Sequence, residues 1–76
     1  MKNLLEYLLI HLVDYPEDVT VEEKETDRGF EYFLKVNPDD MGRVIGKRGA
    51  VIESIRSIAK VRAVKEGIRV FIKLED

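Results

Sequence analysis

The sequence predicts an α+β fold in which helices cover one face of a three-stranded mixed sheet. Two kinds of periodicity carry this prediction. Near the start of the chain, leucines recur at spacings of three and four, which is the period of an amphipathic helix. Later segments alternate apolar and polar residues, which is the period of a half-buried strand. A pair of glycines divides the remaining helical stretch in two.

The first helix is expected over residues 3–13. Its apolar stripe consists of leucines, and Ile10 falls off that stripe, so we expect the Ile10 side chain to be exposed. Tyr15 and Pro16 mark the end of the helix, because a proline disfavours helical geometry in the residue before it.

A hairpin is expected after this helix. Its first strand begins over residues 19–21 and is followed by the polar run 22–26. Turn residues at 26–29 then lead into a second strand over 30–36, where every other side chain is apolar. The hairpin makes this first pair of strands antiparallel.

Two helices are expected before the last strand. Asn37 suits the cap of the first and Pro38 suits its first turn, and Gly46 keeps that helix short. The second helix is expected over 50–64. Gly67 suits a left-handed residue that ends this helix. The alternation of apolar and polar residues over 68–74 predicts the last strand. The second and third strands are therefore joined through two helices, which predicts a parallel pair with a right-handed crossover.

Length and composition indicate one small domain over residues 1–76. The chain has no cysteine, so neither disulfides nor thiolate metal sites contribute to its stability. Glu6 and His11 interrupt the apolar start, and no small-residue cleavage site follows, which argues against a signal peptide. We expect a cytoplasmic protein without a membrane span.

The net charge of −2 hides a strong asymmetry along the chain. Residues 1–42 contain four basic and eleven acidic side chains, which gives −7. Residues 43–74 contain nine basic and two acidic side chains, which gives +7. A basic C-terminal half is a plausible footprint for a polyanion, and a chance distribution of solvated charge is the alternative.

The segment Gly46-Lys47-Arg48-Gly49 lies between the two expected helices and is suited to bind an anion. Glycines allow the backbone to approach a ligand closely. The following helix starts here, so its free N–H groups and the positive end of its dipole face the loop. Lys47 and Arg48 add positive charge, which makes a plain helix–helix turn the weaker interpretation.

This segment resembles the core pattern of KH domains, in which valine-isoleucine-glycine, two variable residues, a glycine and a later isoleucine recur together. The matching residues are Val44, Ile45, Gly46, Lys47, Arg48, Gly49 and Ile52. The element order is similar to the type II KH arrangement over essentially the whole chain. More narrowly, the leucine-rich first helix, residues 13–16 and residues 42–49 resemble small stand-alone bacterial KH proteins of the KhpA type.

The resemblance implies that the loop clamps the backbone of about four nucleotides of single-stranded RNA, with the bases in a groove between the helices and the edge strand. It implies a role as an RNA chaperone or post-transcriptional regulator, without catalysis or cofactor. The implied RNA-binding residues are Arg43, Val44, Ile45, Gly46, Lys47, Arg48, Gly49, Ile52 and Arg69, with Lys73 as an alternative on the last strand. For Val44, core packing stays an equal alternative, and core packing is favoured for Ile55. Because no aromatic residue lies near the loop, we expect modest affinity and a loose sequence preference.

Other kinds of site are not supported. A nucleotide-binding P-loop needs four residues between its glycines and Ser or Thr after the lysine, whereas three residues separate Gly42 from Gly46 and Arg48 follows Lys47. His11 is the sole histidine and lies among leucines, so we expect no metal site and no catalytic centre.

A second apolar stripe on the long helix consists of Val51, Ile58 and Val61. One interpretation is that the first helix covers it. The other, implied by the resemblance, is a partner surface for a homodimer or for a heterodimer with a larger KH-containing protein. A protein–protein adaptor with little RNA binding of its own is therefore the alternative function.

Overall fold

The leucine repeat builds helix α1 (Lys2–Ile10), which buries Leu5 and Leu9 completely. The computed structural model of the protein describes residues 1–75, so Asp76, the last residue of the expected domain, lies outside the described residues. The helix ends earlier than expected, because the Leu12 N–H donates to the Leu9 carbonyl oxygen in a tighter turn. Ile10 is 43% exposed, as predicted.

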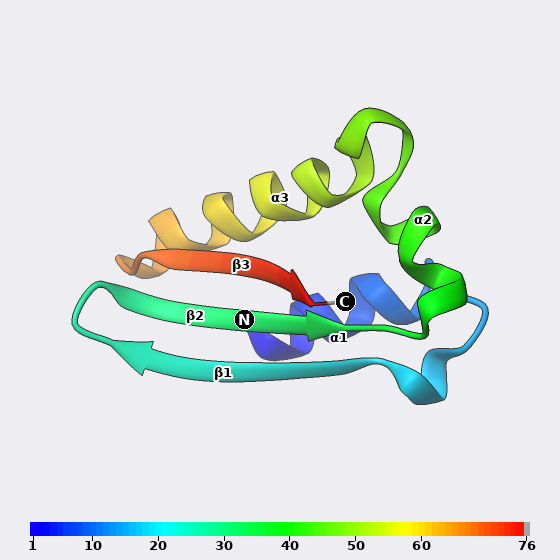
Figure 1. The fold of residues 1–76 in the computed structure, drawn as a ribbon. Helices are drawn as coiled ribbons and strands as arrows, with labels where there is room; N and C mark the ends of the chain where they lie inside the picture. Colours follow the sequence, from blue (N-terminus) through cyan, green and yellow to red (C-terminus); the bar gives the residue numbers. More distant parts are fainter. Residues whose placement is uncertain (76) are drawn as a thin grey trace.

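The strands form one mixed sheet in the order β1-β2-β3 (Figure 1). Strand β1 (Thr20–Thr26) pairs antiparallel with β2 (Gly29–Lys35), and β2 pairs parallel with β3 (Val70–Glu75). Both pairings confirm the prediction. The polar run after Val21 continues β1, and the other strand ends differ from the expected ones by one or two residues.

The segment between β2 and β3 contains helices α2 (Met41–Ile45) and α3 (Ala50–Glu66). Asn37 is the predicted cap: its Oδ1 accepts the Asp39 N–H at 2.8 Å. It caps a short 3-10 turn that leads into α2, and not α2 itself. Helix α3 runs two residues further than expected and ends at Gly67, as predicted, with φ of 71°.

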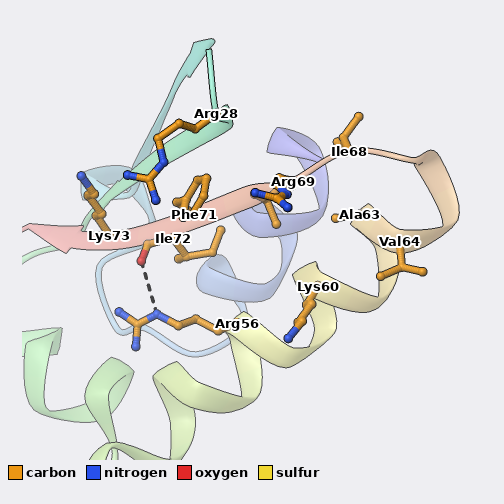
Figure 2. A pocket seen from close by; sticks show the side chains of 11 residues that line it. Arg28, Arg56, Lys60, Ala63, Val64, Ile68, Arg69, Phe71, Ile72 and Lys73 are labelled. Carbon is orange, nitrogen blue, oxygen red and sulfur yellow. Dashed lines mark hydrogen bonds between the residues drawn. The ribbon is translucent and has the colours of Figure 1, made fainter. Parts of the chain in front are cut away.

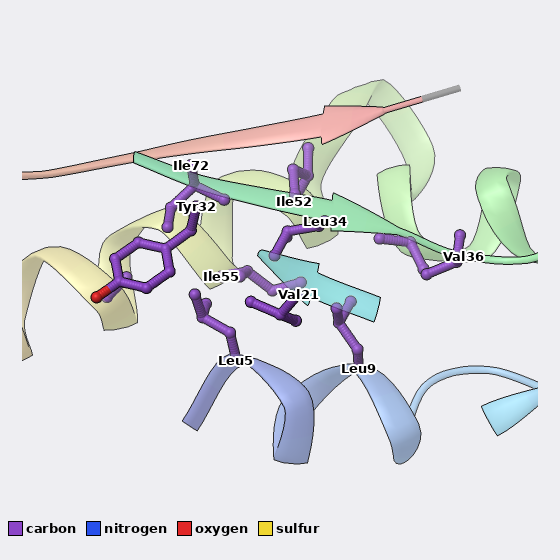
Figure 3. Packing of buried hydrophobic residues seen from close by; sticks show 11 residues of the cluster. Leu5, Leu9, Val21, Tyr32, Leu34, Val36, Ile52, Ile55 and Ile72 are labelled. Atoms are coloured by element: carbon purple, nitrogen blue, oxygen red, sulfur yellow. The ribbon is translucent and has the colours of Figure 1, made fainter. Parts of the chain in front are cut away.

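Helices α1 and α3 lie on the same side of the sheet, so the predicted α+β fold with the order α-β-β-α-α-β is confirmed (Figure 1). The apolar core fills the space between these helices and the sheet (Figure 3). Its buried members are Leu5, Leu9, Val21, Tyr32, Leu34, Val36, Val44, Ile52, Ile55, Ala59 and Ile72. Within residues 1–75, the helices are too short or too polar to cross a bilayer.

A buried carboxylate fixes the start of α2 against the loop that follows α1. Asp40 is 1% exposed, and its two oxygens accept the N–H groups of Asp14 at 3.0 Å and Tyr15 at 3.1 Å. These bonds compensate the cost of burying the carboxylate. Arg43, one turn along α2, adds an ion pair with Asp14 at 3.3 Å. The position of α2, and of the loop that follows it, is therefore tied to the N-terminal part of the chain.

Candidate nucleic-acid interface

The loop between α2 and α3 has a backbone that requires glycine at its first position. Gly46 ends α2 with φ of 78° and ψ of 173°. A Cβ atom at Gly46 would collide with the side chain of Val51, which belongs to the first turn of α3. The missing side chain therefore lets the loop fold back against the helix that follows it.

Lys47, Arg48 and Gly49 form one tight turn, closed by the Gly49 N–H, which donates to the Gly46 carbonyl oxygen at 3.1 Å. Arg48 adopts the left-handed region with φ of 57°, which is uncommon for a residue with a side chain. Lys47 and Arg48 are both exposed to solvent. The turn thus presents two adjacent cations.

Helix α3 begins directly after this turn. Its cap, Gly49, has no side chain to occupy the first N–H groups of the helix, and α3 is 17 residues long. The positive end of the helix dipole therefore lies at the turn, where it adds to the charges of Lys47 and Arg48. This end of the molecule is electropositive and open to a ligand.

A hollow of about 650 Å³ lies between α3 and the edge strand β3 (Figure 2). Its floor is apolar, with Ala63 and Ile72 among the lining residues. The cations around it are Arg28, Arg56, Lys60, Arg69 and Lys73. From α3, the Arg56 Nε–H donates to the carbonyl oxygen of Ile72 at 3.3 Å, as Figure 2 shows. An apolar floor with a cationic rim suits bases flanked by phosphates.

The expected RNA-binding residues lie in two different environments. Arg43, Lys47, Arg48 and Arg69 are exposed, and Arg69 borders the hollow. Ile45 is 38% exposed. Val44 and Ile52, in contrast, belong to the core with 0% and 7% exposure. Of the three aliphatic residues expected to bind RNA, Ile45 is therefore the one with an exposed surface. Ile55 is in the core as favoured.

Most residues of the hollow were not identified from the sequence. They include Arg28, Arg56, Lys60 and Phe71, whereas Arg69 and Lys73 were expected. Arg56 and Lys60 are four residues apart, which places them on one side of α3, and this spacing was the available signal. Arg28 belongs to the hairpin turn, and no local pattern connects it to α3.

The second stripe of α3 is exposed. Ile58 is 44% exposed and Val61 is 67% exposed, so α1 does not cover them. Val64, at 72%, extends the exposed apolar surface toward the end of the helix. Val51 differs, because it is half-buried and packs against the core beside Gly46.

A glycine turn between two helices, on a mixed sheet of this order, defines a KH domain. The chain belongs to the KhpA/KhpB KH-domain family, whose model matches residues 2–74. The family resemblance read from the sequence is thereby confirmed. This is a family of binding domains, and the protein is not an enzyme.

Relatives are similar over nearly their whole length. The RNA-binding protein KhpA of Clostridium perfringens is 43% identical over 74 residues, which cover 97% of this chain and 99% of the relative. That of Clostridium acetobutylicum is 45% identical over the same shares. The RNA-binding protein KhpA of Lactiplantibacillus plantarum is 45% identical over 76 residues, which cover 100% of this chain and 89% of the relative.

Proposed function

We propose that this protein binds single-stranded RNA through the turn Gly46–Gly49 and the hollow between α3 and β3. The observation that carries the proposal is the position of two exposed cations at the electropositive end of a 17-residue helix, whose later turns border a hollow rimmed by five further cations. The names of the KhpA relatives support RNA as the ligand. The protein acts as one domain over 1–76 in the cytoplasm, as an RNA chaperone or post-transcriptional regulator.

The roles within this site divide between backbone and side chains. Gly46 and Gly49 let a phosphate approach the turn, and Lys47 and Arg48 neutralise it. Ile45 contacts the first bases, and Val44 and Ile52 support it from the core. Arg43 on α2 and Arg69 at the border of the hollow add charge. Because the hollow is bounded by a helix and a strand, it accepts unpaired bases and excludes a duplex.

The experiment that tests the proposal reverses the charge of the turn. Lys47→Asp with Arg48→Asp should leave the fold intact, because both side chains are exposed. The double variant should lose most of the affinity for labelled single-stranded RNA in a titration, with circular dichroism as the folding check. Lys2→Asp with Lys65→Asp is the matched control, since it changes the net charge equally at exposed positions outside the site. Equal affinity of both double variants would exclude this site.

The salt dependence of binding gives an independent measure. A turn of this size neutralises about two to four phosphates, so the slope of log affinity against log salt should be about −1.5 to −3 for a single strand. A slope near zero would show that charge does not hold the RNA.

The exposed stripe of α3 supports a second function, in which the protein pairs with a copy of itself or with a larger KH-containing protein. Ile58 and Val61 form an exposed apolar surface on one helix, and a small domain gains stability when such a surface is covered. Pairing would bring two weak RNA sites onto one particle, which raises avidity without a new contact. The alternative is an adaptor that pairs with a partner but binds little RNA. The titration described above distinguishes the two functions, because an adaptor would show little RNA affinity both before and after the charge reversal.

A further inference from the structure

The face of the sheet opposite the helices carries two aromatic rings. Along β2 and β3, Tyr32, Leu34 and Ile72 point into the core, so the residues between them point the other way. These include Phe33 and Phe71, which are half-buried but are not among the residues packed against the core. The sheet register pairs Phe33 with Lys73 and Glu31 with Phe71, so the two rings are diagonal neighbours across the two strands.

Cations lie over both rings. The Arg28 guanidinium is 5.1 Å from the centre of the Phe71 ring, and the Lys73 ammonium is 5.6 Å from the centre of the Phe33 ring. Lys73 also pairs with Glu31 at 3.5 Å, but the Arg28 side chain comes from an exposed hairpin turn. Each ring thus combines a flat apolar surface with a neighbouring positive charge, the combination that holds successive bases of a single strand in proteins that bind without sequence preference.

This open face is continuous with the hollow beside α3. Arg28, Phe71 and Lys73 line the hollow from the sheet, while Arg56 and Lys60 line it from the helix (Figure 2). The edge strand β3 therefore has cations on both of its sides, and these cations border one continuous hollow. A chain that leaves the hollow over β3 reaches Phe71 first and Phe33 next.

We propose that the open face of the sheet is a second binding surface for the same single-stranded RNA, with Phe71 and Phe33 each stacking one unpaired base. This inference rests on the proposed function and extends it beyond the nucleotides held at the glycine turn. Arg28 and Lys73 neutralise the phosphates between the stacked bases. The Arg28 guanidinium is 5.1 Å from the centre of the Phe71 ring, so a base that stacks on this face of the ring takes the place of the guanidinium, which is then free to pair with a phosphate.

Charge and shape favour RNA over the other occupants of such a face. An acidic peptide would be attracted by the cations but carries a planar side chain only at its aromatic residues. A second copy of this chain would bring Arg28 and Lys73 against the same cations of its partner, which is unfavourable. A nucleic acid strand supplies a flat base and a negative charge at every nucleotide, so it matches two neighbouring rings with neighbouring cations.

The test compares two lengths of the same probe. Oligoadenylates of about four and about twelve nucleotides are titrated into isotopically labelled protein, and affinities are taken from NMR shifts. Phe33→Leu with Phe71→Leu should weaken the longer probe by about tenfold or more, since stacking on an aromatic ring contributes about 1–3 kcal/mol per base. Phe33→Leu alone should weaken the longer probe by several-fold and the shorter probe by less than twofold, because Phe33 does not line the hollow. Tyr7→Leu, an exposed aromatic residue on α1, is the matched control and should change neither.

Arg28→Ala provides a variant whose folding is not at risk, because Arg28 is exposed in a turn. It should weaken the longer probe by several-fold and the shorter probe less, because Arg28 borders both the hollow and the open face of the sheet. The inference is overturned if folded Phe33→Leu/Phe71→Leu protein binds both lengths as the wild type does. It is also overturned if the phenylalanine variants change the sedimentation of the protein instead of its RNA affinity, which would make this face a contact between copies. Lys47→Asp/Arg48→Asp should weaken both lengths. If that variant binds normally while the phenylalanine variant does not, the turn is excluded and the sheet surface stands.

Discussion

Helix α3 carries two apolar stripes of similar composition and opposite environment. Ile52, Ile55, Ala59 and Ala63 are at most 7% exposed and face the sheet and α1. Ile58, Val61 and Val64 are at least 44% exposed, although they lie on the same helix and are equally aliphatic. The difference shows that an apolar residue at helical spacing indicates a covered surface without identifying what covers it. One stripe is covered within the chain, and we propose that the other is covered by a partner.

The largest expected effect is a difference in stability between variants of Ile55 and Ile58, which are three positions apart on α3. Ile55→Ala should lower the free energy of unfolding by about 2–5 kcal/mol, because it leaves a cavity in the core. Ile58→Ala should change it by less than about 0.5 kcal/mol in the monomer, as is usual for exposed positions. Urea titration at low protein concentration measures both. Similar losses for the two variants would show that Ile58 is also covered within the chain.

The second effect concerns the proposed partner surface. Ile58→Arg should leave the fold intact and weaken self-association by a factor on the order of a hundred, because it buries a charge at the centre of the contact. Ile10→Arg is a close control, since Ile10 on α1 is 43% exposed against 44% for Ile58. Sedimentation at tens of micromolar measures the oligomeric state. A wild-type protein that is monomeric there would leave only a heterologous partner for the stripe.

The third effect tests the packing of Val51 against Gly46, which makes Val51 half-buried while Ile58 and Val61 are exposed. Gly46→Ala should destabilise the domain by about 1–2 kcal/mol, since the left-handed backbone disfavours a side chain and the added Cβ meets Val51. Gly42→Ala is the control. Gly42 is helical with open space around it, so alanine there should stabilise the protein slightly. Thermal unfolding of the two variants should therefore shift in opposite directions, and equal shifts would contradict the close packing at Gly46.

The smallest expected effect concerns the hydroxyl group of Tyr32, whose ring lies in the core on the covered side of α3. Burial raises the pKa of Tyr32 above its ordinary value, and so does the Glu23 carboxylate, which accepts the Tyr32 hydroxyl at 2.7 Å. An unfolded tyrosine loses its proton near pH 10, whereas folded Tyr32 keeps it. Stability should therefore be complete below about pH 10 and fall above it, by no more than about 1.4 kcal/mol per pH unit. Tyr32→Phe should flatten this loss in urea titrations above pH 10, while Tyr7→Phe should not.

Much of the fold was predictable because its signals are local. The leucine spacing, the alternation in the strands, and Asn37 and Gly67 at element ends each depend on a few neighbouring residues. The error at the end of α1 is also local. Helical periodicity continues to residue 13, but the His11 Nδ1–H donates to the Tyr7 carbonyl oxygen at 2.8 Å and Leu12 closes a tighter turn. Periodicity reports which face is apolar and not where the backbone bonds change.

The site was predictable only in part. The turn was identified because Gly46 and Gly49 and the charges between them are adjacent in sequence. The hollow was not, because it depends on Arg28, Arg56 and Phe71, which are brought together by the pairing of β2 with β3 and by the packing of α3. No aromatic residue is close to the turn in the sequence, whereas the fold places Phe71 on the edge strand, where it lines the hollow.

The contact between Arg56 and Ile72 has a consequence for behaviour at high concentration. Within residues 1–75, strand β3 pairs with β2 and with no other strand. The Arg69 carbonyl oxygen accepts the Phe30 N–H on that side, so the peptide groups of Ile72 point to the open edge. Open edges of this kind are templates on which strands of other chains add and aggregate. From α3, Arg56 donates a hydrogen bond to the Ile72 carbonyl oxygen and places a positive charge at this edge. Arg56, which also borders the hollow, therefore opposes the addition of another strand to the edge of β3. A ligand that breaks the bond between Arg56 and Ile72 would expose this edge, unless the ligand itself covers β3.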